Sequence, residues 1–207
     1  AAPVGYLRPR ATNGGYEPRG AFGELGRDLN CLTCHTINGR GGDLAPDLSS
    51  EGSRANAPWL RQYLRNPYTL RPTLVERMPK FNLTDGEIEV LVNYMTTALV
   101  RDDIPKAPFS PQRVTDAEIR EGRRLYKEVY RCQTCHQIRY QGGTMGPELV
   151  SSDTNILERR TLGWIYAWIK NPRRLDPRTK EPVLGLSDQE ALLVTKYLVA
   201  ASKGRDR

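Results

Sequence analysis

Two five-residue segments of the same pattern contain every cysteine and every histidine of the chain. They are Cys31-Leu32-Thr33-Cys34-His35 and Cys132-Gln133-Thr134-Cys135-His136, and together they hold all 4 cysteines and both histidines. The pattern C-x-x-C-H is typical of c-type haem attachment, in which both thiols bond to the haem and the histidine binds the iron. The sequence therefore predicts two covalently attached haem c groups, with His35 and His136 as the proximal iron ligands.

Other uses of paired cysteines leave part of this pattern unexplained. A zinc ribbon pairs two C-x-x-C knuckles about 15 to 20 residues apart, whereas a much longer stretch separates Cys34 from Cys132. A thioredoxin-like motif lies in a βαβ unit, and neither segment has that setting. A disulfide closed within each C-x-x-C does not explain why histidine follows both copies. Haem attachment accounts for all six residues.

The net charge indicates what kind of partner the protein binds. The chain has 31 Lys and Arg against 24 Asp and Glu, a formal charge of +7. The arginines are scattered and haem propionates would offset part of this charge, so we expect no nucleic-acid partner. A basic rim would instead steer association with an acidic redox protein.

Localisation follows from the haem prediction. Covalent haem attachment in bacteria takes place outside the cytoplasmic membrane, and the chain opens Ala1-Ala2-Pro3, as expected after cleavage at small residues. No apolar run approaches the roughly 18 residues of a transmembrane segment. We therefore expect an exported protein, periplasmic or peripheral on the outer side of the cytoplasmic membrane.

The sequence around the two pentapeptides is repeated. A glycine-rich loop follows each histidine and ends in proline, at Pro46 and Pro147, with equal spacing from the first cysteine. Trp59 and Trp164 each begin a stretch with apolar residues at i, i+1, i+4 and i+5 that stops at an Asn-Pro pair. This pattern predicts a helix with one buried face in each copy.

Capping boxes predict where three further helices begin. In each, a Ser or Thr is followed three residues later by Glu: Thr84 with Glu87, Thr115 with Glu118, and Ser187 with Glu190. The helix before Cys31 should be shorter than the helix before Cys132, because its apolar pattern is poorer and it contains three glycines.

Together these elements predict an all-α chain with four segments. Residues 1–20 are rich in Gly, Pro and Arg and indicate an extended arm. Residues 21–100 and 113–207 are the two helical domains. Residues 101–112 carry three prolines among charged residues and indicate a linker.

The order of elements resembles a class I cytochrome c domain, and the resemblance covers most of the chain, twice over. The resemblance implies two tandem cytochrome c-like helical domains, each wrapped around one covalently bound haem c. In that family the distal ligand is a methionine shortly before the last helix. The stretch from Met78 to Thr84 is similar to the family's Met-Pro-x-Phe-x-Leu-Ser/Thr pattern, which implies Met78 as the distal ligand of the first haem.

The resemblance also implies roles for residues that surround each haem. Pro46 and Pro147 would help to orient the proximal histidines. Trp59 and Trp164 match family positions that line the haem or pack at a helix crossing.

The second copy departs from this pattern at the distal ligand. When the closing helices are aligned, Glu181 lies opposite Met78. The alternatives are coordination by Glu181 as a carboxylate, by Lys180 as a neutral amine, by Met145 although it precedes the proximal-side proline, or by a side chain from outside the domain. A further alternative is an open or water-bound position.

These features favour electron transfer. We expect redox protein partners: a quinol-oxidising complex or dehydrogenase as donor and a downstream acceptor, with the chain a subunit of a membrane respiratory or photosynthetic complex. No catalytic constellation stands out beside the haems. The alternative is a dihaem oxidoreductase, peroxidase-like or oxidising a sulfur compound, with an open or exchangeable distal site on the second haem.

Overall fold

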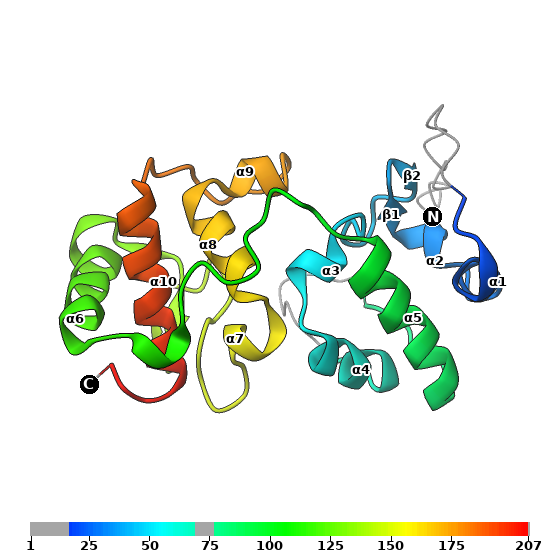
Figure 1. The fold of residues 1–207 in the computed structure, drawn as a ribbon, viewed down its shortest axis with the longest axis horizontal. Coiled ribbons are helices and arrows are strands. Elements are labelled where there is room, and N and C mark those ends of the chain that lie inside the picture. Colours follow the sequence, from blue (N-terminus) through cyan, green and yellow to red (C-terminus); the bar gives the residue numbers. More distant parts are fainter. Residues whose placement is uncertain (1–16, 69–76, 207) are drawn as a thin grey trace, which may run out of the picture. The chain divides into compact units, whose positions relative to one another are not determined.

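The computed structural model describes residues 17–68 and 77–206. Helices dominate this part of the chain, and the β-structure consists of two short antiparallel hairpins (Figure 1). The chain divides into two compact units. Unit 1 comprises residues 1–52 and 57–101, and unit 2 comprises residues 53–56 and 102–207.

Unit 1 is built around α5 (Asp85–Ala98), the long helix that lies C-terminal to its C-x-x-C-H segment. Its elements are α1 Gly20–Asp28, α2 Cys31–Cys34, β1 Thr36–Ile37, β2 Arg40–Gly41, α3 Glu51–Arg54 with its last two residues grouped in unit 2, α4 Ala57–Arg65 and α5 Asp85–Ala98. Helix α5 packs against both α1 and α4. The ring of Tyr94 on α5 stacks on Phe22 of α1, with ring centroids 3.9 Å apart.

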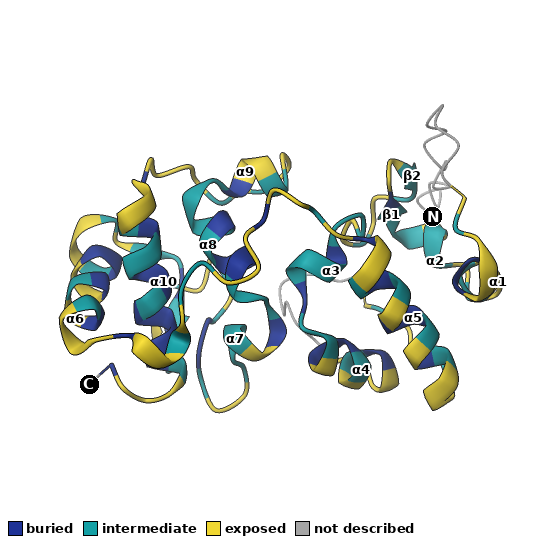
Figure 2. Ribbon diagram, viewed as in Figure 1, coloured by how far each residue is buried: buried dark blue, intermediate teal, exposed yellow. Residues whose placement is uncertain are grey.

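Unit 2 repeats this order with additional turns. Its elements are η1 Pro111–Arg113, α6 Asp116–Arg124, the π-helical turn η2 Leu125–Val129, η3 Cys132–Thr134, β3 Gln137–Ile138, β4 Gln141–Gly142, α7 Ile156–Arg159, α8 Leu162–Lys170, α9 Pro172–Leu175 and α10 Asp188–Ser202. Buried residues of α6, η2, α8 and α10, dark blue in Figure 2, belong to the main apolar core of this unit. The helical stretch before Cys132, α6 with η2, is longer than α1, which confirms the expected difference.

The three predicted capping boxes are confirmed. Thr84, Thr115 and Ser187 each accept a bond from the backbone N–H of the glutamate three residues on, and each glutamate accepts the backbone N–H of its cap. The reciprocal bonds satisfy two backbone donors that a helix start leaves unpaired. Acidic side chains in each first turn also favour the positive end of the helix dipole.

Helices α6 and α10 cross at Gly122. A Cβ atom at this position would lie 2.2 Å from the carbonyl oxygen of Leu193 and 2.9 Å from the Cβ of Tyr197. Only glycine therefore allows the two backbones this close an approach. The ring of Tyr126 packs beside Tyr197, with ring centroids 5.3 Å apart.

The segment predicted as a linker packs on unit 2. Ile104 is buried in a small cluster with Trp164 and Ala167 of α8. The backbone approaches α8 so closely that a Cβ at Gly163 would lie 1.6 Å from the carbonyl oxygen of Pro105. Residues 102–112 are thus grouped with unit 2 instead of forming a separate connector. The reason is that Ile104 is an apolar side chain in a charged stretch and gains from burial.

Most of the predicted N-terminal arm, residues 1–16, lies outside the described residues. Its last part is held within unit 1, since the Glu17 carboxylate pairs with the Arg40 guanidinium at 2.8 Å. Helix α1 begins at Gly20, one residue before the expected domain start.

A short segment of the first sequence copy is grouped with unit 2. The Asn56 side-chain amide contacts the carbonyl oxygens of Leu157, Glu158 and Arg160 at 2.8, 2.9 and 3.0 Å. Ala55 forms an isolated antiparallel bridge with Arg160. No helix in residues 17–68 and 77–206 combines the length and apolar character needed to cross a membrane.

Candidate haem-attachment sites

The first C-x-x-C-H segment forms one helical turn. Asn30 before it is in the left-handed region, with φ 54°, and reverses the chain after α1. Cys31 and Cys34 lie at the two ends of α2, and both thiols are free of disulfide bonds. The backbone N–H of His35 bonds to the Cys31 carbonyl at 2.9 Å, so the histidine leaves the turn at a defined point.

The histidine ring is oriented by the loop that follows. His35 Nδ1 lies 2.7 Å from the carbonyl oxygen of Pro46. A carbonyl only accepts, so Nδ1 carries the hydrogen and Nε2 is left with its lone pair. The β1–β2 hairpin brings this loop back, and a Cβ at Gly41 would lie 2.1 Å from the His35 carbonyl oxygen. The geometry fits the orienting role expected of Pro46.

The second segment has a similar backbone geometry, with the 3-10 turn η3 in place of the α-helical turn α2. His136 Nδ1 lies 2.9 Å from the carbonyl oxygen of Pro147. Arg131 is in the left-handed backbone region, with φ 50°, as Asn30 is before the first segment. A Cβ at Gly142 would lie 2.2 Å from the His136 carbonyl oxygen. Cys132 and Cys135 are also free of disulfide bonds.

The Cys31 and Cys132 thiols differ from those of redox-active C-x-x-C motifs. Burial raises the pKa of the Cys31 thiol. Burial, and next the nearby charge of Glu181, raise the pKa of Cys132 to about 11. Redox-active C-x-x-C motifs instead have a lowered thiol pKa. Within the described residues no group of three or more His, Cys, Asp or Glu side chains gathers as a metal cluster would.

The side chains of His136 and Glu181 face each other in unit 2. The two carboxylate oxygens of Glu181 lie 3.3 and 3.2 Å from His136 Nε2. Burial acts to lower the pKa of His136, but its bonds to Glu181 and Pro147 outweigh this effect, so the pKa is raised. Glu181 is therefore the predicted residue that the structure brings directly to the iron-binding nitrogen of a histidine.

The other predicted ligands lie in different environments. Met78 is partly buried and lies shortly after the undescribed residues 69–76. Lys180 is exposed. Met145 is 83% exposed, and the loop beyond it lies against the His136 ring, because a Cβ at Gly146 would be 2.5 Å from the ring's Cε1.

Trp59 and Trp164 are both buried and pack against other side chains of the protein. Trp59 is buried, stacks on Tyr63 with centroids 4.9 Å apart, and donates its indole N–H to the Tyr68 hydroxyl at 3.0 Å. Trp164 is buried with Ile104, and the guanidinium of Arg54 lies over its ring. A haem-lining role for either remains a prediction.

Sequence reasoning missed one buried polar group in unit 2. The Tyr126 hydroxyl is buried, and among the described residues it has no hydrogen-bond partner. Burial raises the pKa of Tyr126, as does the proximity of Cys132. The sequence signal was only an apolar position in the helix before Cys132, which does not reveal an unsatisfied hydroxyl.

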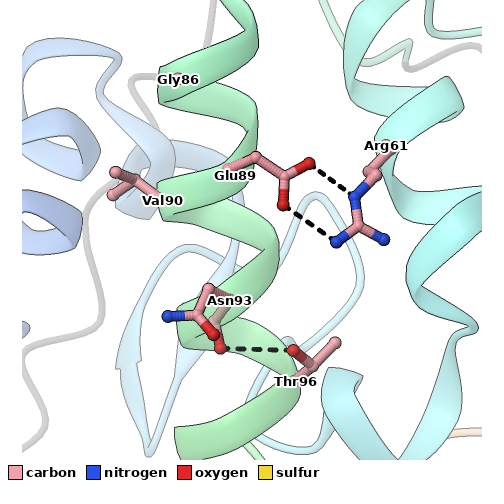
Figure 3. A pocket seen from close by; sticks show the side chains of 6 residues that line it. All are labelled: Arg61, Gly86, Glu89, Val90, Asn93 and Thr96. Carbon is pink, nitrogen blue, oxygen red and sulfur yellow. Dashed lines mark hydrogen bonds and ion pairs between the residues drawn. The ribbon is translucent and has the colours of Figure 1, made fainter.

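A surface hollow on unit 1 contains none of the predicted site residues. It lies along α4 and α5 and is lined by Arg61, Gly86, Glu89, Val90, Asn93 and Thr96 (Figure 3). The Arg61 guanidinium binds both oxygens of Glu89 at 2.6 and 2.9 Å. The charged groups of this hollow therefore satisfy each other.

Both C-x-x-C-H segments fit a covalently bound haem c. Each offers two unpaired thiols close together on one turn, and a histidine whose Nδ1 is held by a carbonyl so that Nε2 faces away from the loop. An imidazole held in this way is a preoriented iron ligand.

Comparison with known families agrees with this geometry for the first segment. Residues 24–98 match the family model described as Cytochrome c. The matched stretch contains Cys31, Cys34 and His35 and includes Met78. This family implies covalently bound haem c, electron transfer and redox partners. The chain therefore contains a cytochrome c domain, at residues 24–98.

Proposed function

We propose that the protein is a dihaem electron-transfer cytochrome with two tandem cytochrome c domains, each holding one covalently attached haem c. The observation that carries this proposal is the equivalence of the two attachment segments. His136 is held by Pro147 as His35 is held by Pro46, with Nδ1 to carbonyl distances of 2.9 and 2.7 Å. The second segment thus offers the donors that haem attachment requires.

Further equivalences between the units support the proposal. Gly42 N–H bonds to the Leu32 carbonyl at 2.8 Å, and Gly143 N–H bonds to the Gln133 carbonyl at the same distance. Both hairpins pair the residue after histidine with the first glycine of the loop. Both closing helices, α5 and α10, begin with a capping box. Local sequence and backbone geometry therefore agree along both copies.

The number of haems tests the proposal. In the purified holoprotein we expect two haems per chain by pyridine haemochrome assay and by intact mass. The double substitution Cys132→Ala with Cys135→Ala should reduce the number to one. The matched pair Cys31→Ala with Cys34→Ala should do the same through the other unit. A wild-type protein with a single haem, or one that the Cys132 and Cys135 substitutions leave unchanged, would refute the dihaem assignment.

The expected role is to carry electrons between other proteins. Haem c supplies a one-electron ferric–ferrous couple, while the protein holds the histidines and sets the surroundings of each iron. In the first domain we propose Met78 as the distal ligand of the haem iron. Its thioether would raise the reduction potential of that haem. We place the protein outside the cytoplasmic membrane, in a respiratory or photosynthetic complex, between a quinol-oxidising complex or dehydrogenase and a downstream acceptor.

One observation favours a second function, a dihaem oxidoreductase. The Glu181 carboxylate lies on the iron-facing side of His136, where a distal acid or base would act. Carbon monoxide added to the reduced protein distinguishes the two functions. Rapid binding at one haem supports an oxidoreductase acting on peroxide or a sulfur compound. Failure to bind at either haem supports a simple electron carrier.

A further inference from the structure

The two nitrogens of His136 have different partners. Nδ1 donates its hydrogen to the Pro147 carbonyl, 2.9 Å away. In the neutral imidazole Nε2 therefore has no hydrogen and presents a lone pair. That lone pair faces the Glu181 carboxylate, and it is where an iron would bind.

The two carboxylate oxygens of Glu181 lie next to His136 Nε2. Its oxygens lie 3.3 and 3.2 Å from Nε2, at nearly equal distances. The Glu181 side chain is only 30% exposed. When Nε2 carries a proton it donates that proton to the Glu181 carboxylate. When Nε2 is unprotonated both groups are acceptors, so a metal cation between them can take the place of the proton.

The backbone supports this placement. The N–H of Glu181 donates to the hydroxyl of Thr179 at 3.2 Å, which fixes the start of the turn. Residues 176–187 contain no helix or strand. Metal bonds to imidazole nitrogen and carboxylate oxygen are each about 2 Å long, so an iron between the two groups would require them to separate by less than about 1 Å. A loop without regular structure can adjust by this amount.

The position of Glu181 in the chain also matches the ligand of the first domain. Glu181 and Met78 stand at the same spacing before the capping boxes that start α10 and α5, and each is followed by proline. The capping boxes are formed in both units, so they are fixed reference points for this comparison. Glu181 therefore occupies the distal-ligand register of its domain.

The competing ligands are less well placed. Lys180 is exposed and precedes the residue that faces His136. Met145 is 83% exposed and belongs to the loop that backs onto the His136 ring. Among the described residues, the side chain that contacts His136 Nε2, where the distal ligand must approach, is that of Glu181.

We infer that Glu181 is the distal iron ligand of the second haem, which makes the two haems of this chain chemically different. The inference rests on the proposed presence of a haem in unit 2. A carboxylate is a hard anionic ligand that stabilises ferric iron, whereas a thioether stabilises ferrous iron. The second haem therefore has the lower reduction potential, and reducing equivalents would collect on the first.

The experiment uses holoprotein whose content of two haems has first been established. The wild-type ferric protein should give the sulfur-to-iron charge-transfer band in the near infrared for one haem only. Glu181→Met should add a second band of this kind and raise the midpoint potential of one haem, while the other potential is unchanged. Glu181→Gln should change the electron paramagnetic resonance signal of one haem. Lys180→Gln and Met145→Leu are matched controls and should leave all spectra unchanged.

Two results would overturn the inference. One is a wild-type spectrum with sulfur-to-iron bands from both haems, which does not depend on any variant folding. The other is a Glu181→Gln protein whose paramagnetic signals and both midpoint potentials equal those of the wild type. A wild-type protein with a single haem would be a different failure, because it would refute the dihaem assignment before the ligand could be tested.

Discussion

The crossing of α6 and α10 allows a sharp test of the fold of unit 2. Gly122 is the contact point, where a Cβ would lie 2.2 Å from the carbonyl oxygen of Leu193 and 2.9 Å from the Cβ of Tyr197. We predict that Gly122→Ala destabilises unit 2. The carbonyl cannot turn away, because it accepts a hydrogen bond within α10. The helices must therefore separate.

The magnitude follows from the distances. A carbon–oxygen contact needs about 3.3 Å, so the crossing must open by about 1 Å. A gap of this size removes about a quarter to a half of each van der Waals attraction across it. Overpacking costs about 3 kcal/mol at the upper end of its usual range. Alanine regains about 1 kcal/mol of helix propensity. The net loss is about 2 kcal/mol, or about 10 °C in melting temperature for a unit of this size.

The measurement is thermal and denaturant unfolding of the holoprotein, followed by circular dichroism. Gly86→Ala is the control, because Gly86 is exposed in the first turn of α5 and the nearest atom to its Cβ would be the Thr84 hydroxyl oxygen at 4.0 Å. It should be neutral or stabilising by up to about 1 kcal/mol. The reasoning is refuted if Gly122→Ala melts at or above the wild-type temperature.

Two further predictions concern acid stability and the first haem. A hydrogen bond from Lys196, followed by the backbone N–H of Thr115, lowers the pKa of Glu118 from 4.5 to about 2. The stability that this carboxylate contributes is complete above about pH 4.5 and is lost as the pH falls toward 2. Glu118→Gln should therefore weaken the dependence of the unfolding free energy on pH in that window. Urea unfolding at each pH measures this dependence. Met78→Ala should abolish the sulfur-to-iron charge-transfer band of the first haem and lower its potential; a band that survives would assign the thioether to another methionine.

Features that depend on near neighbours were predictable from the sequence. The C-x-x-C-H segments, the capping boxes at Thr84, Thr115 and Ser187, and the helix ends before Pro67 and Pro172 each involve residues a few positions apart. Their geometry follows from backbone hydrogen bonding and proline sterics, which act locally.

Contacts between distant residues were decided by the tertiary structure. Glu181 was one of several ligand candidates until the fold placed its carboxylate beside His136, 45 positions earlier in the chain. Ile104 stood in an expected linker but is buried beside Trp164. Asn56 contacts carbonyls 101 to 104 positions later. Such pairings depend on how whole helices pack, which periodicity and spacing in one sequence do not specify.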